Sequence, residues 1–142
     1  MANYKYDAFI CYDLDLMEDC CLARNTVCKN IKNARFFTHD DILVGENEFN
    51  TTENVLFDDC AAVIFILSED SLKRPQTLHY FEIAQTRHSQ DSLFQFIIIS
   101  FEIDLDIRVK NFIKVGKFCG VVHEIRMHDP LLTSKIKLIL NL

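Results

Sequence analysis

Short apolar runs alternate with longer polar segments along this chain. The runs at 61–67 (AAVIFIL) and 94–100 (FQFIIIS) are almost continuous, which is typical of strands covered on both faces in a parallel sheet. Similar but less regular runs occur near the N-terminus and in the last third of the sequence. We therefore predict strands at 6–12, 34–39, 61–67, 94–100 and 118–123, of which the one at 34–39 is the shortest.

The segments between these runs carry apolar residues at helical spacing. Asp15 and Glu18 have the spacing of a capping box, and apolar positions recur from there to Ile31 as on one face of a helix. The later helices are predicted at 47–57, at 77–87 with Thr77 as the N-cap, and from Pro130 to the end with this proline in the first turn.

The alternation of strands and helices predicts an α/β fold with a doubly wound sheet. Right-handed crossovers leave only a few topologies for such a chain. We expect a flavodoxin-like three-layer fold, with a five-stranded parallel sheet of order 2-1-3-4-5 and helices on both faces. A chain of 142 residues is long enough for one domain of this kind, 1–142, and too short for two.

Acidic residues flank the first predicted strand. In doubly wound sheets, ligands and partners bind outside the carboxyl ends of the strands, near the point where the strand order reverses. Asp13 and Asp15 follow the first strand at that place, although Asp15 also fits the role of a helix cap. Asp7 enters the strand at its opposite end, so we do not expect it to share a site with them.

The charge balance is acidic, with 21 Asp and Glu against 15 Lys and Arg and a net charge of −6. This balance disfavours nucleic-acid binding, which needs a basic face. No stretch approaches the ~18 apolar residues of a membrane span, and the N-terminus shows no targeting pattern. We expect a cytoplasmic protein, or the cytosolic part of a membrane receptor, without direct membrane insertion. The six cysteines fit buried free thiols better than disulfides.

Motifs for cofactor or metal chemistry are missing from the sequence. The three glycines, Gly45, Gly116 and Gly120, form neither a phosphate-binding loop nor a dinucleotide fingerprint. No CxxC pair and no helical pair of histidines at four-residue spacing suggests a zinc site. We therefore expect no cofactor and no metal.

Several motifs resemble, in order and spacing, those of Toll/interleukin-1 receptor (TIR) domains. YDAFICY at 6–12 resembles the first box of the family, and HDDILVG at 39–45 resembles the second, usually written RDxxPG. AAVIFILSEDSL at 61–72 resembles the third strand with the loop after it, and LHYFEIA at 78–84 resembles the helix that commonly reads WCxxE. The resemblance covers nearly the whole chain and is closest to animal Toll-like receptors and the myeloid-differentiation adaptor.

The resemblance implies an innate-immune signalling module that assembles by homotypic contacts with TIR domains of itself, receptors or adaptors. A weak homo-oligomer is then expected. The segment Ser68, Glu69 and Asp70 and the helix from Thr77 would support the main contact loop. Because these loops are acidic, their partner surface should be basic. The main contact loop consists of His39, Asp40, Asp41, Ile42, Leu43, Val44, Gly45 and Glu46.

Some TIR domains hydrolyse NAD+, and the resemblance places Glu82 at the position of their catalytic glutamate. The alternative function is therefore that of an NAD+ glycohydrolase or cyclase, with NAD+ as substrate. Leu78 stands where the family has a tryptophan, and the chain contains no tryptophan, so the C-terminal FW box is absent too. Asp40 and Val44 replace the arginine and the proline of the second box. Under this alternative, the nucleotide would contact Asp13, Asp15, Ser68, Glu69, Asp70 and Leu78.

Overall fold

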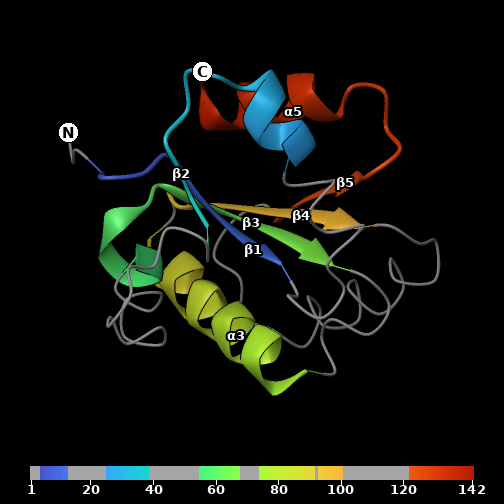
Figure 1. Ribbon diagram of the computed structural model, residues 1–142. Coiled ribbons are helices and arrows are strands. Elements are labelled where there is room, and N and C mark those ends of the chain that lie inside the picture. Colours follow the sequence, from blue (N-terminus) through green and yellow to red (C-terminus); the bar gives the residue numbers. More distant parts are fainter. Residues whose placement is uncertain (1–3, 13–24, 39–54, 68–73, 92, 101–121) are drawn as a thin grey trace, which may run out of the picture.

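The structure is a computed structural model that describes residues 4–12, 25–38, 55–67, 74–91, 93–100 and 122–142 (Figure 1). Within these residues, five parallel strands form one sheet in the order β2-β1-β3-β4-β5. The strands are β1 (Ala8–Tyr12), β2 (Phe36–Phe37), β3 (Ala62–Leu67), β4 (Gln95–Ser100) and β5 (Val122–Arg126). The predicted α/β fold and its strand order are confirmed.

Helices cover both faces of the sheet and give the fold three layers (Figure 1). One face carries α3 (Pro75–Gln90) and the short π-helix η3 (Val55–Asp59). The other face carries a helical segment at 25–30 and α5 (Leu132–Leu140). None of the described helices is long and apolar enough to cross a membrane.

Alternate residues of the strands supply two separate apolar cores, as the period of a β-strand requires. Phe65 and Phe96 are fully buried on the side of α3, where the ring of Phe65 lies 5.1 Å from that of Phe81. Ile64 and Ile97 are fully buried on the side of α5 and segment 25–30. Each such side chain contributes about 1.5–3 kcal/mol through burial, so the continuous runs of β3 and β4 explain why these strands form the centre of the sheet.

The last strand extends further along the chain than predicted. The expected strand was 118–123, whereas β5 comprises Val122–Arg126, and 118–121 lie outside the described residues. As an edge strand, β5 pairs only with β4, and Ile125 is its buried residue while Arg126 is exposed. An edge strand half exposed to solvent needs no continuous apolar run, so the search for such a run missed the end of β5 at 124–126.

The predicted starts of two helices also need correction. α3 begins at Pro75, and its N-cap is Arg74 rather than Thr77, which is buried inside the helix. Proline fits the first turn because the N–H that it lacks would have no partner there. α5 begins at Leu132, so Pro130 precedes the helix instead of lying in its first turn. The predicted helix at 47–57 overlaps η3 at its end, and 47–54 lie outside the described residues.

α5 ends in a left-handed residue. Asn141 has φ 60° and ψ 44°, a conformation that asparagine tolerates better than most residues. The N–H of Asn141 donates to the carbonyl of Leu138 at 3.2 Å, and the N–H of Leu142 donates to that of Lys137 at 2.9 Å. These two bonds satisfy carbonyls that the last turn would leave unpaired, and they define the direction in which Leu142 leaves the helix.

Candidate functional site

The carboxyl ends of β1 and β3 lie next to each other in the sheet. Tyr12 is the partner of Ile66 in the pairing of these two parallel strands, so the chain leaves both strands at the same end of the sheet, the carboxyl end. This is the place where a doubly wound sheet binds its ligands. The residues predicted to follow these strands, Asp13 and Asp15 after β1 and Ser68, Glu69 and Asp70 after β3, lie outside the described residues.

Helix α3 starts at the same carboxyl end of the sheet and carries the two predicted site residues that the structure describes. Its first turns contain Leu78, which is half-buried, and Glu82, which is exposed one turn further along the same side. The opposite side of the helix packs on the sheet through Tyr80, Phe81 and Ala84. The structure therefore places Leu78 and Glu82 on the accessible side of α3.

Glu82 has few contacts in the described part of the chain. Its backbone carbonyl accepts a hydrogen bond from the Thr86 hydroxyl at 3.0 Å, which belongs to the regular turn of the helix. No hydrogen bond or ion pair links its carboxylate to another described residue. A carboxylate in this position is free to meet a ligand or a partner, or to remain a solvated surface charge.

The predicted contact loop, from His39 to Glu46, lies outside the described residues. The sequence before it is described up to Thr38, which is buried directly after β2. The position of β2 at one edge of the sheet means that the loop begins at the side of the molecule farthest from β5.

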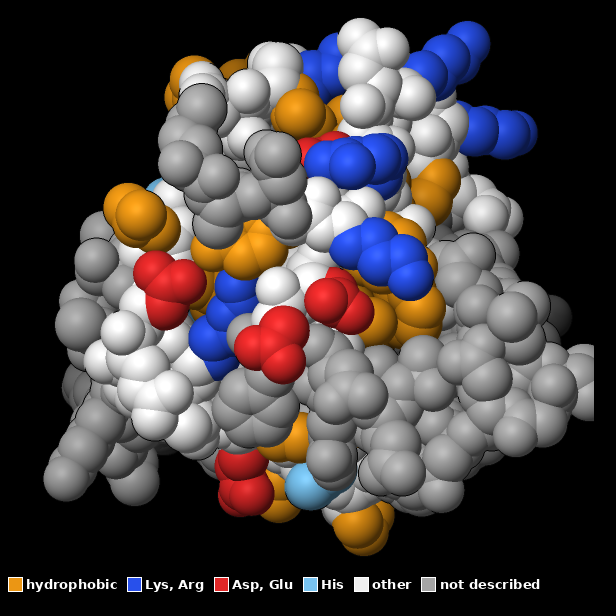
Figure 2. All heavy atoms as spheres, turned by 90° about the vertical axis from the view of Figure 1, so that its left-hand side faces the viewer, with side chains coloured by type: hydrophobic (Ala, Val, Ile, Leu, Met, Phe, Trp, Pro, Cys, Tyr) orange, Lys and Arg blue, Asp and Glu red, His pale blue; other side chains and the backbone are white. Residues whose placement is uncertain are grey.

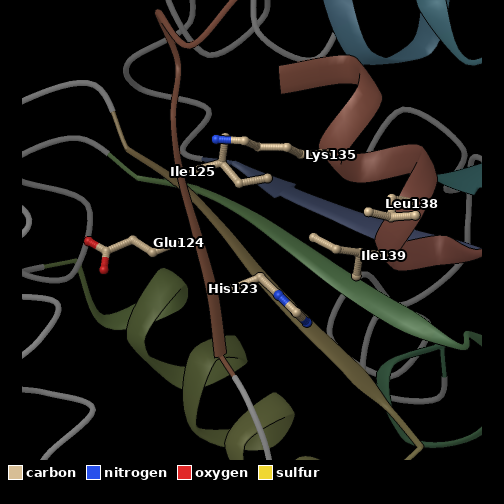
Figure 3. A pocket seen from close by; sticks show the side chains of 6 residues that line it. All are labelled: His123, Glu124, Ile125, Lys135, Leu138 and Ile139. Atoms are coloured by element: carbon tan, nitrogen blue, oxygen red, sulfur yellow. The ribbon is translucent and has the colours of Figure 1, made fainter. Parts of the chain in front are cut away.

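A hollow that the sequence did not reveal lies at the opposite edge, between β5 and α5 (Figure 3). It has a volume of about 290 Å3 and is bordered by Leu138 and Ile139 of α5 and by Ile125 and His123 of β5. Burial lowers the pKa of His123, which keeps its imidazole neutral near pH 7. Lys135 reaches over the same region from α5, and the side chain of Glu124 leaves β5 on the opposite side (Figure 3).

The outer side of α5 exposes apolar side chains. Leu138 is 82% exposed, and Leu131 and Leu142 at the two ends of the helix are also exposed. The opposite side of α5 is buried, and there Leu132 and Ile136 pack on the sheet. Leu138 also borders the hollow, and exposed apolar side chains beside a hollow are typical of contact surfaces.

Basic side chains gather over the layer that contains α5 and segment 25–30, as Figure 2 shows. The exposed lysines of this layer are Lys29, Lys32, Lys135 and Lys137. Asp129 is bound to Lys135, and this hydrogen bond together with the N–H of Leu131 lowers the pKa of the Asp129 carboxyl. The layer is therefore locally basic in a chain whose net charge is −6.

A buried arginine is the second feature that the sequence did not reveal. Arg87 donates from Nη1 to the carbonyl of Leu56 at 2.7 Å and to Sγ of Cys60 at 3.6 Å. Its guanidinium lies 4.2 Å from the ring centre of Phe94 and 5.4 Å from that of Tyr4. These contacts join α3 to η3 and to the start of β4, which is a structural role. The spacing of Arg87 from Tyr80 and Ala84, on the buried side of α3, was the signal available in the sequence.

The described residues contain no cluster of three or more His, Cys, Asp or Glu that could hold a metal ion. No disulfide joins Cys11, Cys28 or Cys60 within the described residues; Cys11 and Cys60 are buried and Cys28 is partly buried, whereas Cys20, Cys21 and Cys119 lie outside the described part of the chain. Burial raises the pKa of the Cys60 thiol to about 11, although Arg87 acts in the opposite direction. This thiol therefore stays protonated and unreactive at neutral pH.

No protein-family model matches this sequence, and no curated protein matches it. A metazoan TIR-STING receptor from C. gigas has a similar structure, with a TM-score of 0.51 and 17% sequence identity. The match covers 70% of this chain and 31% of the receptor chain. At this identity the similarity concerns the fold alone, so the chain has a fold of the TIR type, with its sheet order and layers as described above.

Proposed function

We propose that this chain is an assembly module that binds domains of the same fold, including its own copies, in a signalling pathway of innate immunity. The observation that carries this proposal is the set of exposed leucines on α5 and at its ends, of which Leu138 borders the hollow at β5. A surface of this kind needs a partner to remove it from water. The similarity of the fold to a TIR-STING receptor supports a partner of the same kind, a TIR domain of a receptor or an adaptor.

Charge supports association between copies. The segment from His39 to Glu46 combines acidic residues with Ile42, Leu43 and Val44, whereas the layer of α5 and segment 25–30 exposes four lysines. Surfaces of opposite charge on one chain attract each other in two copies, and they orient the copies before close contact. The acidic segment remains our main candidate for the contact loop, with Gly45 and Asp41 as its residues shared with the TIR pattern.

The experiment that tests this function uses the chain immobilised on beads, which capture the labelled chain from solution. Clustering on a bead raises the effective concentration and reveals contacts that are weak in dilute solution. We expect capture of the wild-type chain and a clear loss for the double variant Asp41→Ala with Gly45→Ala. Capture that is equal for both chains would remove the loop from the contact, and no capture of the wild type would overturn the function.

A second candidate function is hydrolysis or cyclisation of NAD+ with Glu82 as the catalytic residue. The observation in its favour is that Glu82 and Leu78 share the accessible side of α3, near the carboxyl ends of the strands. A carboxylate there would stabilise positive charge on the ribose as nicotinamide leaves. NAD+ turnover by the bead-clustered chain, lost in Glu82→Gln, would establish this activity. A chain that releases no nicotinamide when clustered would exclude Glu82 from catalysis.

A further inference from the structure

Four large hydrophobic side chains are exposed in the described part of the chain, and they occupy two places. Three of them, Leu131, Leu138 and Leu142, belong to α5 and its ends. The fourth is Leu93, which is 80% exposed in the turn between α3 and β4. One place therefore offers an apolar surface beside a hollow, and the other offers a single projecting side chain.

The turn that carries Leu93 is fixed by hydrogen bonds. Oδ1 of Asp91 accepts from the N–H of Leu93 at 3.0 Å, and the carbonyl of Asp91 accepts from the N–H of Phe94 at 3.2 Å. Phe94 itself is buried against the Arg87 guanidinium, which anchors the turn to the core. A leucine held in this way loses little conformational freedom when it enters a pocket, so it is suited to act as an anchor.

The surroundings of Leu93 are acidic. Asp91 precedes it by two residues, and Asp58 and Asp59 lie at the same end of the sheet, because the chain continues from them into β3, whose Ala62 pairs with Gln95. Figure 2 views this end of the molecule and shows acidic and exposed hydrophobic side chains close together. The anchor is thus an apolar side chain with carboxylates beside it.

The hollow between β5 and α5 has the complementary character. Leu138, Ile139 and Ile125 give it an apolar lining, and Lys135, which is paired with Asp129, lies over it with its side chain 48% exposed. Lys137 adds a second exposed cation on the same helix. An apolar hollow with a lysine on its border and a second lysine on the same helix accepts a leucine flanked by carboxylates better than it accepts a basic segment.

We propose that Leu93 of one copy inserts into the hollow between β5 and α5 of a second copy, with Asp91 next to Lys135. This inference rests on the proposed function and adds a second contact to that of the loop from His39 to Glu46. The joined surfaces are different on the two copies, so each copy still presents one unused surface to a further copy. A single anchor buries less than the area of about 1,000 Å2 typical of stable interfaces, so the contact is weak until copies are clustered.

A symmetric pairing of two α5 helices is the competing use of the same leucines. It would bring Lys135 and Lys137 of both copies together, because the exposed lysines lie on the helix that would form the contact. Like charges brought together in this way oppose association, whereas the Leu93 contact joins opposite charges. The charges therefore favour Leu93 as the occupant of the hollow.

The test uses bead capture of the full chain with two charge substitutions at exposed leucines, Leu93→Asp and Leu138→Asp. Because both residues are exposed, the substitutions should leave the fold intact, which urea unfolding verifies. Thr86→Asp, at an exposed residue of α3 outside both the hollow and the turn of Leu93, adds the same charge elsewhere and serves as the matched control. We expect each variant to capture itself about tenfold more weakly than the wild type, and the control to behave as the wild type.

The decisive measurement combines the two variants. Beads that carry Leu138→Asp keep an intact Leu93, and soluble Leu93→Asp keeps an intact hollow, so one complete contact forms between them. Capture in this mixture should return to within about threefold of the wild type. A Leu93→Asp variant that captures itself as the wild type does would overturn the proposal. So would a mixture without recovery, which would assign the leucines of α5 to each other or to another partner. If the wild type captures nothing, the proposed function fails as well.

Discussion

Asp7 and Arg35 join the entrances of two neighbouring strands through backbone and side-chain contacts. The carboxylate of Asp7 accepts the backbone N–H of Arg35 at 2.7 Å, and the N–H of Asp7 donates to the carbonyl of Arg35 at 2.8 Å. The Arg35 guanidinium lies 3.7 Å from the same carboxylate and donates to the carbonyl of Tyr4 at 3.1 Å. The acidic residue before β1 is therefore a structural connection to the short edge strand β2.

Asp7→Ala should lower the free energy of unfolding by about 1 kcal/mol, because the N–H of Arg35 loses its acceptor. Arg35→Ala should cost less, about 0.5 kcal/mol, because it removes only an exposed ion pair and a bond to Tyr4 while the backbone bonds remain. Urea unfolding of the two variants measures both values. Equal losses would mean that the ion pair, and not the bond to the backbone, holds the strands together.

Substitution of Arg87 should destabilise the fold much more than substitution of an exposed helix arginine. Arg87→Met keeps most of the apolar bulk but leaves the carbonyl of Leu56 without its donor, so we expect a loss of about 2 kcal/mol in unfolding free energy. Arg87→Lys should be destabilising too, because an ammonium group cannot stack flat on the Phe94 ring. The exposed Arg35 is the comparison: if Arg87→Met is as mild as Arg35→Ala, the buried contacts contribute little.

Cys60 should make the fold weaker in alkaline solution. Burial raises its pKa from 9.0 to about 11, so above pH 9 the unfolded chain loses this proton while the folded chain keeps it. The contribution of Cys60 to the free energy of unfolding is therefore fully present below pH 9. It declines as the pH rises toward 11, by about 2–3 kcal/mol in total. Urea unfolding at several pH values should give a steeper decline for the wild type than for Cys60→Ala. Parallel declines would show that other groups cause it.

Asp129 should make the fold less stable in acid solution. Its hydrogen bonds with Lys135 and with the N–H of Leu131 lower its pKa, so the ionised form is favoured in the folded chain. The resulting stabilisation is present above the ordinary pKa of an aspartate and is lost as the pH falls through the lowered value. Asp129→Asn should therefore be less stable than the wild type at pH 7, and the difference should disappear at about pH 2. A difference that persists in acid would contradict this origin.

The centre of the fold was predictable from the sequence because it consists of continuous apolar runs. β3 and β4 were expected at 61–67 and 94–100, and the structure has them at Ala62–Leu67 and Gln95–Ser100. Right-handed crossovers leave only a few topologies for such a chain, and the order expected among them, 2-1-3-4-5, is the one observed. The edges were harder to predict, since β2 comprises only two residues and β5 has a single buried residue, Ile125.

The candidate surfaces, too, were predictable only in part from the sequence. The helical period separates Glu82 and Leu78, on the accessible side of α3, from Tyr80 and Ala84 on the buried side, and this period can be read from the sequence. The hollow at β5 and α5 was not predictable, since it depends on how Ile125, Leu138 and Ile139 from two elements meet in space. Leu93 was not singled out either, because a lone leucine beside a strand looks like part of the core.

Sedimentation velocity over a range of protein concentrations, at about 0.05 M and about 0.5 M NaCl, tests the central claim most directly. The account predicts that the average sedimentation coefficient rises with concentration, and that the rise is smaller at high salt because the surfaces have opposite charge. A chain that sediments as a monomer at every concentration and at both salt concentrations would contradict assembly as its function.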